Sequence, residues 1–528
     1  MTTEVKTKNP RFIKLAIPLL GILGGVQGVD PNIAATALPE ASKALGMQGD
    51  LQALAASIST LALAASVVST GLLADRIGRR KVLLAALLLS AIGDIIVVLA
   101  PQSTFYLAGR AIAGIGLGAV YGAAFAYIRA VSTPKTLPSA IGVFTAVLMT
   151  FTVIFTFLGG ALSDVDWRLT FLVTPVVAVA CFFAVPLVLP SEPVVSTGKA
   201  DAVGQIALVI AVAGTLYGIG NLSRGVTDPF FYLPLVVGIA AAAGFVWREK
   251  TCADAFFPIE LFRSPVFLAA ILAGLVYNMG NAVAFLQMSN LWHYATRLNS
   301  LEVSLWQLPF LLLGVAAGLV FGKRMSKGMS NRTALLIGTV ITSAGFVLLA
   351  VVSAADSFWI FLVPSGLIGF GIVVASLPFG NLIMQSAPAR YFGPVTSART
   401  TIGQVWYTIG LAISTVMVDK MTTGGVIKRL EEAGVPSTQL GTAVDKVTAY
   451  ASQTHDETSK IGAEVLAGVR DSYLVGFNIT MLVFAAILLL AGLLGVALLT
   501  KTSGDPKGGA SSAANPSGAT TESSTAPH

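Results

Sequence analysis

The chain has 528 residues, of which 55% are hydrophobic and 11% are charged, and its net charge is +7. Soluble domains are about 45–50% apolar and about 25% charged, so this composition excludes an ordinary soluble protein. Apolar stretches of about 20 residues, the length that spans about 30 Å of hydrocarbon, recur without a period of two, and they predict spanning helices rather than a barrel. Because membrane proteins gather positive charge in cytoplasmic loops, the net charge does not indicate a nucleic-acid partner.

The apolar stretches and the polar turns between them predict an all-α integral membrane protein with fourteen spanning helices. When the N-terminus is placed inside, most lysines and arginines of the short loops fall inside, which puts both termini in the cytoplasm. A chain with twelve spans is the alternative, and two of the stretches would then be re-entrant. The predicted spans are 12–38, 51–73, 81–100, 104–127, 138–162, 168–190, 203–222, 229–247, 266–290, 303–322, 333–353, 358–385, 393–418 and 473–499.

The spans divide the chain into six, two and six helices. Before the last span, residues 419–472 form an extracytoplasmic loop whose apolar positions recur at a spacing of three to four, which predicts a small helical hairpin. The final segment is rich in Gly, Ser, Ala, Pro and Thr and is expected to be disordered. The expected units are a cytoplasmic N-terminus (1–11), a six-helix bundle (12–190), two linker helices (191–250), a second six-helix bundle (251–500) and a cytoplasmic tail (501–528).

Three ionisable residues, Asp30, Asp94 and Arg110, lie inside predicted spans of the N-terminal half. At 1.5 Å per residue, each lies about 9–13 Å from the outer end of its helix. Charges in hydrocarbon are costly and are functional candidates by default. An arginine at this depth needs at least one carboxylate partner.

Two pairings remain open, because both carboxyl groups lie at the depth of Arg110. If Asp94 neutralises Arg110, then Asp30 keeps no partner, and a carboxyl group buried without a partner takes up a proton readily, as a coupling site requires. If Arg110 pairs with Asp30, the proton is carried by Asp94. The structural alternatives are that Asp94 and Arg110 form a clamp and that Asp30, which precedes Pro31, orders a broken helix.

The stretch GLLADRIGRR joins the second and third spans on the predicted inside. A basic loop fixes topology, but Gly71 also permits close helix contact, Gly78 permits a tight turn, and Asp75 stands among four cations. The stretch closely resembles the G-x-x-x-D-R-x-G-R-R signature of the major facilitator superfamily of secondary transporters. The resemblance implies a gating loop in which Asp75, Arg76 and Arg79 stabilise one access state and release in the other.

A degraded copy of this motif, GKRMSKGMSNR at 322–332, follows the tenth span, as an internal repeat of half the protein predicts. Other stretches are similar to motifs of the fourteen-span drug:proton antiporters. GVDPNIAATALP matches at Asp30 and Pro39, LAGRAIAG matches at Arg110 and Gly114, and GGALSDVDWRLTFL and FPIELF are also similar. The family's G-P-x-x-G-G in the fifth span keeps only its last two glycines here.

The resemblance implies a secondary active transporter that exports hydrophobic or amphipathic compounds by alternating access, with a proton gradient as energy source and no cofactor. The missing Gly-Pro keeps open a transporter of lipids or cell-envelope precursors, and a solute importer is a further alternative. The family and the short loops imply the inner membrane of a prokaryote, and we expect a monomer whose partners are its substrate and the bilayer.

The fifth and ninth spans offer aromatic and amide side chains for a substrate cavity, although most such residues serve packing or bonds between helices. An enzyme is not expected, because the three histidines, His293, His455 and His528, do not cluster with Cys or acids as a metal or nucleophile site requires. No G-x-x-x-x-G-K-[ST] loop is present, which argues against ATP-driven transport. The candidate cavity residues are Phe144, Phe151, Phe155, Asn278, Asn281 and Gln287.

Overall fold

The structure, a computed structural model, is built from long helices and contains no strand among the residues that it describes, which are 10–47, 50–133, 135–163, 165–191, 201–252, 257–298, 300–386, 392–432, 436 and 460–503. The helices are α1 (Pro10–Leu45), α2 (Asp50–Ile77), α3 (Arg79–Val98), α4 (Ser103–Ala130), α5 (Leu137–Ser163), α6 (Trp167–Thr170), α7 (Val173–Val188), α8 (Ala202–Gly220), η1 (Leu222–Arg224), α9 (Pro229–Thr251), η2 (Ile259–Arg263), α10 (Pro265–Tyr294), α11 (Ser300–Trp306), α12 (Leu308–Ser326), α13 (Asn331–Val352), α14 (Phe358–Ser386), α15 (Phe392–Glu432) and α17 (Lys460–Ser503).

Within these described ranges, 13 helices are long and apolar enough to cross a membrane. The helix α1 has 36 residues but is not in that set, so the count of fourteen spans stays a prediction. Two predicted spans are each built from two helices: 168–190 from α6 and α7, and 303–322 from α11 and α12. Gln307 separates α11 from α12, and Pro309 stands at the start of α12, where a helix tolerates its missing N–H.

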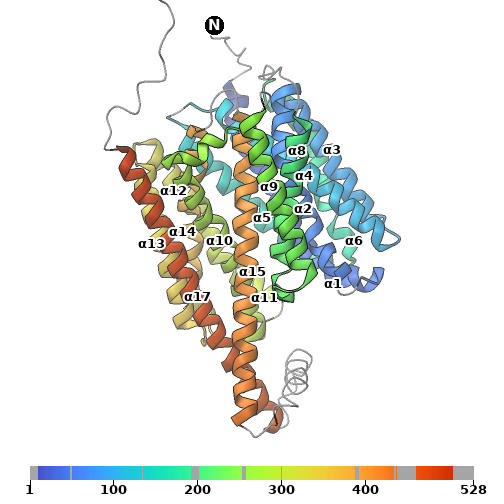
Figure 1. The fold of residues 1–528 in the computed structure, drawn as a ribbon, viewed down its shortest axis with the longest axis vertical. Helices are drawn as coiled ribbons and strands as arrows, with labels where there is room; N and C mark the ends of the chain where they lie inside the picture. The colour runs from blue at the N-terminus through green and yellow to red at the C-terminus, as the bar shows by residue number, and fades with distance from the viewer. Residues whose placement is uncertain are drawn as a thin grey trace, which may run out of the picture.

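The helices α1 to α5 and α7 lie on one side of the molecule. The helices α10, α12, α13, α14 and α17 lie on the other side, and α8 and α9 form a separate pair (Figure 1). The two sides meet where α5 packs against α12 and where α15 packs against α2 and α4. The grouping into six, two and six spans stays a prediction.

One end of the molecule carries the turn at Gly78, and we call it the motif end. The helix α1 begins there and α17 ends there (Figure 1). Gly78 has a φ of 100° between α2 and α3, and Gly328 has a φ of 114° in the matching turn between α12 and α13. L-residues with a side chain rarely adopt such a φ, so both turns require glycine. The two equivalent turns support the internal repeat expected from the degraded second motif.

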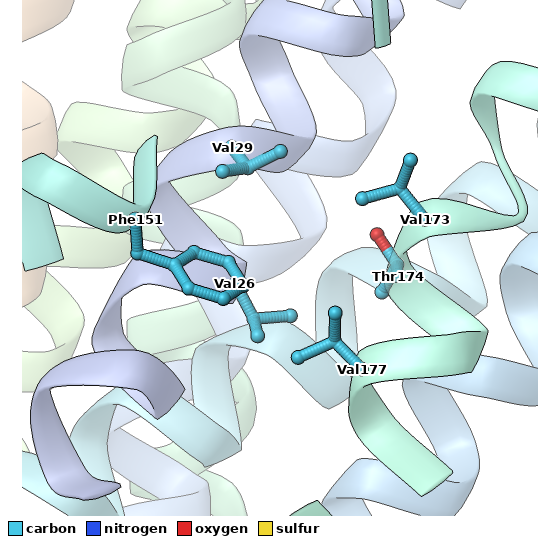
Figure 2. A pocket seen from close by; sticks show the side chains of 6 residues that line it. All are labelled: Val26, Val29, Phe151, Val173, Thr174 and Val177. Atoms are coloured by element: carbon cyan, nitrogen blue, oxygen red, sulfur yellow. The ribbon is translucent and has the colours of Figure 1, made fainter. Parts of the chain in front are cut away.

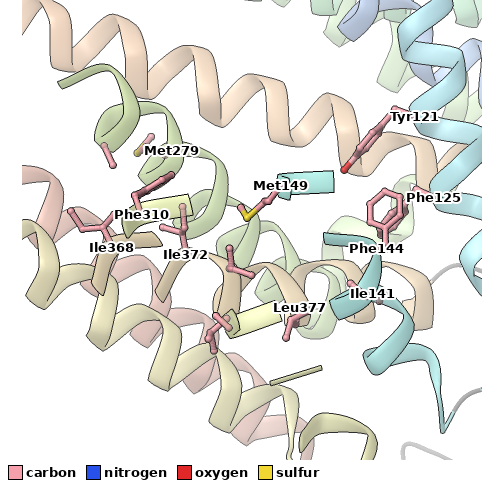
Figure 3. Packing of buried hydrophobic residues seen from close by; sticks show 14 of the residues in the cluster. Tyr121, Phe125, Ile141, Phe144, Met149, Met279, Phe310, Ile368, Ile372 and Leu377 are labelled. Carbon is pink, nitrogen blue, oxygen red and sulfur yellow. The ribbon is translucent and has the colours of Figure 1, made fainter. Parts of the chain in front are cut away.

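The core is continuous across the junction between the two sides. Phe144 of α5 and Phe310 of α12 are both fully buried in one apolar cluster that includes residues of α1, α3, α10 and α14 (Figure 3). At the motif end, a Cβ on Gly142 of α5 would overlap the carbonyl oxygen of Gly318 in α12. The backbone N–H of Ser139 donates to Ser326 Oγ at 2.9 Å. The two sides are therefore tightly packed at this end.

At the opposite end, α15 and α17 extend together beyond the other helices (Figure 1). The predicted hairpin at 419–472 is helical where it is described, but these parts continue α15 and α17 instead of forming separate helices. Arg429 and Asp471 form an exposed ion pair between the two extensions at 3.2 Å. Residues 437–459 and most of the termini expected at 1–11 and 501–528 lie outside the described residues.

Candidate functional site

The three charged residues predicted inside the spans come together in one buried cluster. Asp30 of α1, Asp94 of α3 and Arg110 of α4 are each at most 1% exposed. Arg110 Nη1 and Nη2 donate to Asp30 Oδ1 and Oδ2 at 2.6 Å and 2.8 Å, which is the bidentate geometry of the strongest guanidinium–carboxylate pairs. Ser59 of α2 donates a further hydrogen bond to Asp30 Oδ2 at 3.0 Å. Both carboxylate oxygens of Asp30 are therefore fully engaged.

Asp94 is held much less tightly than Asp30. Arg110 Nη1 lies 3.3 Å from Asp94 Oδ1, and this is a second contact of a nitrogen that already donates to Asp30. Thr174 of α7 lies beside Asp94. Neither the Thr174 hydroxyl nor Asp94 Oδ2 has a hydrogen-bond partner among the described residues. Asp94 thus combines complete burial with an uncommitted oxygen.

Close helix packing places the three side chains at one level. A Cβ on Gly114 of α4 would overlap the carbonyl oxygen of Ser59, so only glycine lets α2 approach α4 closely enough to bring Ser59 to Asp30. The ring of Phe171 lies 5.2 Å from the Arg110 guanidinium carbon, within the range of a cation–π contact. Gly114 was one of the residues that matched the family motif.

The formal charge of the cluster depends on one proton. With both carboxyl groups ionised the cluster carries one net negative charge, and with one of them protonated it is neutral. Isolated charge in a low-dielectric interior is costly, so binding and release of a single proton would change the electrostatic energy of this site strongly. Of the two pairings that the sequence left open, the structure shows Arg110 paired mainly with Asp30.

A narrow, mainly apolar pocket lies beside the cluster, between α1, α5 and α7 (Figure 2). In this conformation the gap between the lining side chains is too narrow to hold a water molecule. Figure 2 shows Phe151 on one side of it and Thr174, the neighbour of Asp94, on the other. The pocket is lined by Val26, Val29, Phe151, Val173, Thr174 and Val177.

The predicted cavity residues of α5 lie in different surroundings. Phe151 lines this pocket and stacks on Phe155 with ring centroids 4.1 Å apart. Phe144 lies deeper, fully buried against Phe125 and Tyr121 of α4. Figure 3 shows these last three rings as one group.

The predicted amide residues lie on α10, in the other half. The Asn278 side chain donates to the carbonyl of Gly274 on its own helix at 2.8 Å. Gln287 is fully buried and donates to Ser414 of α15 at 3.2 Å. Asn281 is half-buried. Of the six predicted cavity residues, Phe151 lines the pocket beside the charged cluster, and a substrate cavity that includes the other five stays a prediction.

The predicted gating loop has the expected turn geometry. Gly71 is buried in α2, and Gly78 forms the turn at which α3 begins. Arg79 is buried and Arg76 is half-buried at this turn. Asp75 lies in the last turn of α2, but its side chain is outside the described part of the structure.

Sequence reasoning missed one buried charge in the second half. Arg399 of α15 is 5% exposed and donates from Nη1 to the Tyr121 hydroxyl at 2.6 Å. It stands seven residues after the start of α15, and its position inside the predicted span 393–418 was the signal that could have revealed it. Within the described residues, no group of His, Cys, Asp and Glu is arranged to hold a metal ion.

Comparison with known proteins identifies relatives along nearly the whole chain. The multidrug efflux pump LfrA of Mycolicibacterium smegmatis is 22% identical over 492 residues, which cover 93% of this chain and 96% of the relative. The multidrug resistance protein Stp of Mycobacterium tuberculosis is 26% identical over 395 residues, 73% of this chain and 72% of the relative.

Solved structures show the same fold at low identity. The human organic anion transporter MFSD10 matches with a TM-score of 0.60 at 14% identity, over 92% of this chain and all of that chain. The proton:xylose symporter XylE matches with a TM-score of 0.58 at 13% identity, over 94% of this chain and 96% of that chain. Residues 20–411 match the family described as the Major Facilitator Superfamily. The chain is therefore a membrane transporter and not an enzyme, and it belongs to the Major Facilitator Superfamily.

Proposed function

We propose that this transporter exports hydrophobic or amphipathic compounds in exchange for protons, by alternating access. The observation that carries the proposal is the buried cluster of two carboxyl groups and one guanidinium, which holds one carboxyl group more than the cation neutralises. Buried ionisable groups within spanning helices are costly and mark ion pathways. The names of the relatives in Mycolicibacterium and Mycobacterium support export of drug-like compounds.

Asp94 is the proposed carrier of the proton. Asp30 is engaged by Arg110 and Ser59, whereas Asp94 has a long contact on one oxygen and no partner for the other among the described residues. A proton on Asp94 makes the cluster neutral without breaking the bidentate pair. Asp30 and Arg110 are then the groups that position and balance Asp94.

The proposed topology has fourteen spans grouped as six, two and six, with both termini in the cytoplasm and the protein in the inner cell membrane. The motif end is the cytoplasmic end, because the turns at Gly78 and Gly328 are rich in lysine and arginine. The tight contact between α5 and α12 at this end then makes the described conformation closed toward the cytoplasm. The proposed working unit is a monomer.

Transport of lipids or cell-envelope precursors is the second candidate. The side chains that face one another between α1, α5 and α7 beside the charged cluster are mainly apolar, and an acyl chain requires such a lining once the gap between them widens. The fifth span also lacks the Gly-Pro of the drug:proton antiporters.

The test measures proton movement in proteoliposomes that contain a trapped pH-sensitive dye and hold an imposed pH gradient. Tetraphenylphosphonium, a lipophilic cation, is added to vesicles with wild-type protein, Asp94→Asn or Asp356→Asn. Asp356 is an exposed acid outside the cluster and is the matched control. We expect the compound to dissipate the gradient with wild type and Asp356→Asn but not with Asp94→Asn.

Normal coupling in Asp94→Asn would remove Asp94 as the carrier. If a panel of lipophilic cations and neutral amphiphiles moves no protons with wild type, proton-coupled export is wrong. Translocation of a fluorescent lipid by the same vesicles then tests the second candidate, and uptake of the panel compounds in the opposite direction tests an importer.

A further inference from the structure

Arg399 is a buried cation at the junction between the two halves. Its guanidinium carbon lies 4.2 Å from the ring centroid of Phe125 in α4 and 4.7 Å from that of Phe379 in α14. Nη1 donates to the hydroxyl of Tyr121, also in α4, at 2.6 Å. The cation is therefore enclosed between two aromatic rings that belong to opposite halves.

Arg399 has no carboxylate partner among the described residues, and its Nε makes no hydrogen bond there. This contrasts with Arg110, which binds two carboxyl groups at similar burial. A buried cation without a counter-charge is costly, and ring contacts and one neutral hydrogen bond offset only part of that cost. Holding the halves together requires no cation here, because apolar side chains would pack between Phe125 and Phe379.

Separation of the halves at the motif end would expose this cation. Tyr121 and Phe125 belong to the N-terminal half, whereas Arg399 and Phe379 belong to the C-terminal half. Nearby, α5 and α12 also meet across the same junction at Gly142. When these contacts open, Arg399 would lie on the wall of the gap between the two halves, with free donors and with the Phe379 ring beside it.

We propose that Arg399 binds the anionic headgroup of the substrate, and that the substrates include amphiphiles with a single negative charge. The guanidinium fork matches the geometry of a carboxylate, and the adjacent aromatic ring accepts the apolar part of the same molecule. This proposal rests on the proposed export function and specifies a substrate class for it.

The test compares ligands that share one chain and differ in charge. Purified protein in nanodiscs of neutral phosphatidylcholine is titrated with radiolabelled decanoate and, in parallel, with the neutral decanol and the cation tetraphenylphosphonium, with empty nanodiscs subtracted. The variants are Arg399→Gln and Arg399→Lys. Arg324→Gln is the matched control, because Arg324 also lies over a phenylalanine ring at the motif end but is exposed.

We expect wild type to bind decanoate more tightly than decanol. Arg399→Gln should weaken decanoate binding at least about ten-fold, the size expected for a lost charge-assisted hydrogen bond, and should leave decanol and tetraphenylphosphonium nearly unchanged. Arg399→Lys should be intermediate, because it keeps the charge and loses the fork. Arg324→Gln should behave like wild type.

Equal binding of decanoate and decanol by wild type would overturn the proposal, and so would an equal loss of all three ligands in Arg399→Gln, which would make Arg399 a contact between the halves only. If Arg399→Gln does not fold, Arg399→Met, whose chain packs between the two rings, replaces it. If this proposal is wrong but the export function is right, tetraphenylphosphonium still drives proton movement in the proteoliposomes. If the export function is wrong, it drives none.

Discussion

Removing the charge of Asp30 and removing that of Asp94 should have different effects on stability, because Arg110 contacts the two carboxyl groups unequally. Asp30→Asn leaves Arg110 with a single carboxylate contact, to Asp94 at 3.3 Å, and removing the main charged partner of a buried ion pair costs about 3–5 kcal/mol. Asp94→Asn keeps the bidentate pair with Asp30 and should cost clearly less. Thermal unfolding of the two variants in detergent measures the difference, and equal melting temperatures would contradict this account of the cluster.

Gly114 should tolerate no side chain, because it sets the distance between α2 and α4. In Gly114→Ala the new methyl group overlaps the Ser59 backbone, so the helices must separate, at a cost of about 1–3 kcal/mol. The same change moves Ser59 away from Asp30. Gly244→Ala is the control, since a Cβ at Gly244 meets nothing within 4 Å. Unfolding temperatures of both variants test this, and a wild-type value for Gly114→Ala would show that the contact is not tight.

The sequence made Asp30, Asp94 and Arg110 visible because charges are rare in apolar spans, but it could not decide their pairing. The pairing depends on how each helix is rotated about its axis, and helices that are apolar on every side carry little information about rotation. Arg399 escaped notice for a related reason. It lies only two turns from the start of α15, where an arginine is usually a loop cation that fixes topology.

At the scale of whole elements, the turn at Gly78 is constrained by its backbone and not by packing. A Cβ there would meet nothing within 4 Å, but the φ of 100° and ψ of 129° are strained for any residue with a side chain. Gly78→Ala should therefore destabilise the protein by about 1–3 kcal/mol. Gly160→Ala, which lies in equally open space within α5, should be neutral or slightly stabilising. Chemical unfolding of the two variants provides the comparison, and equal effects would mean that this turn is not strained.

Element ends were the least predictable feature of the fold. The spans were recognised from length and apolarity, which determine whether a segment can cross a membrane. By the same criterion the thirteenth span is predicted to end at 418, whereas α15 continues to Glu432. The helix continues because its polar last turns pack along α17 through Gly425 and Ser472. Contacts between distant segments of this kind extend a helix beyond its apolar part, and no local pattern reveals them.

At the scale of the whole molecule, alternating access requires the two halves to separate where they are now joined. Ser139 of α5 and Ser326 of α12 lie across that junction, with 2.9 Å between Ser139 N and Ser326 Oγ. A cysteine at each position should form a disulfide, because the Ser326 side chain already contacts the backbone of Ser139 and a small movement brings two sulfur atoms into bonding range. The native Cys181 and Cys252 are first replaced by alanine to remove other thiols.

Oxidation of Ser139→Cys/Ser326→Cys should stop transport, and reduction should restore it, because the cross-link prevents the motif end from opening. Each single cysteine variant, treated in the same way, should keep its activity. The cross-linked protein should also lose binding of decanoate, since Arg399 stays enclosed between Phe125 and Phe379, while the Asp30–Arg110 pair, which lies within the N-terminal half, is unaffected. Transport by fully cross-linked protein would mean that substrates cross by a route that does not open between α5 and α12.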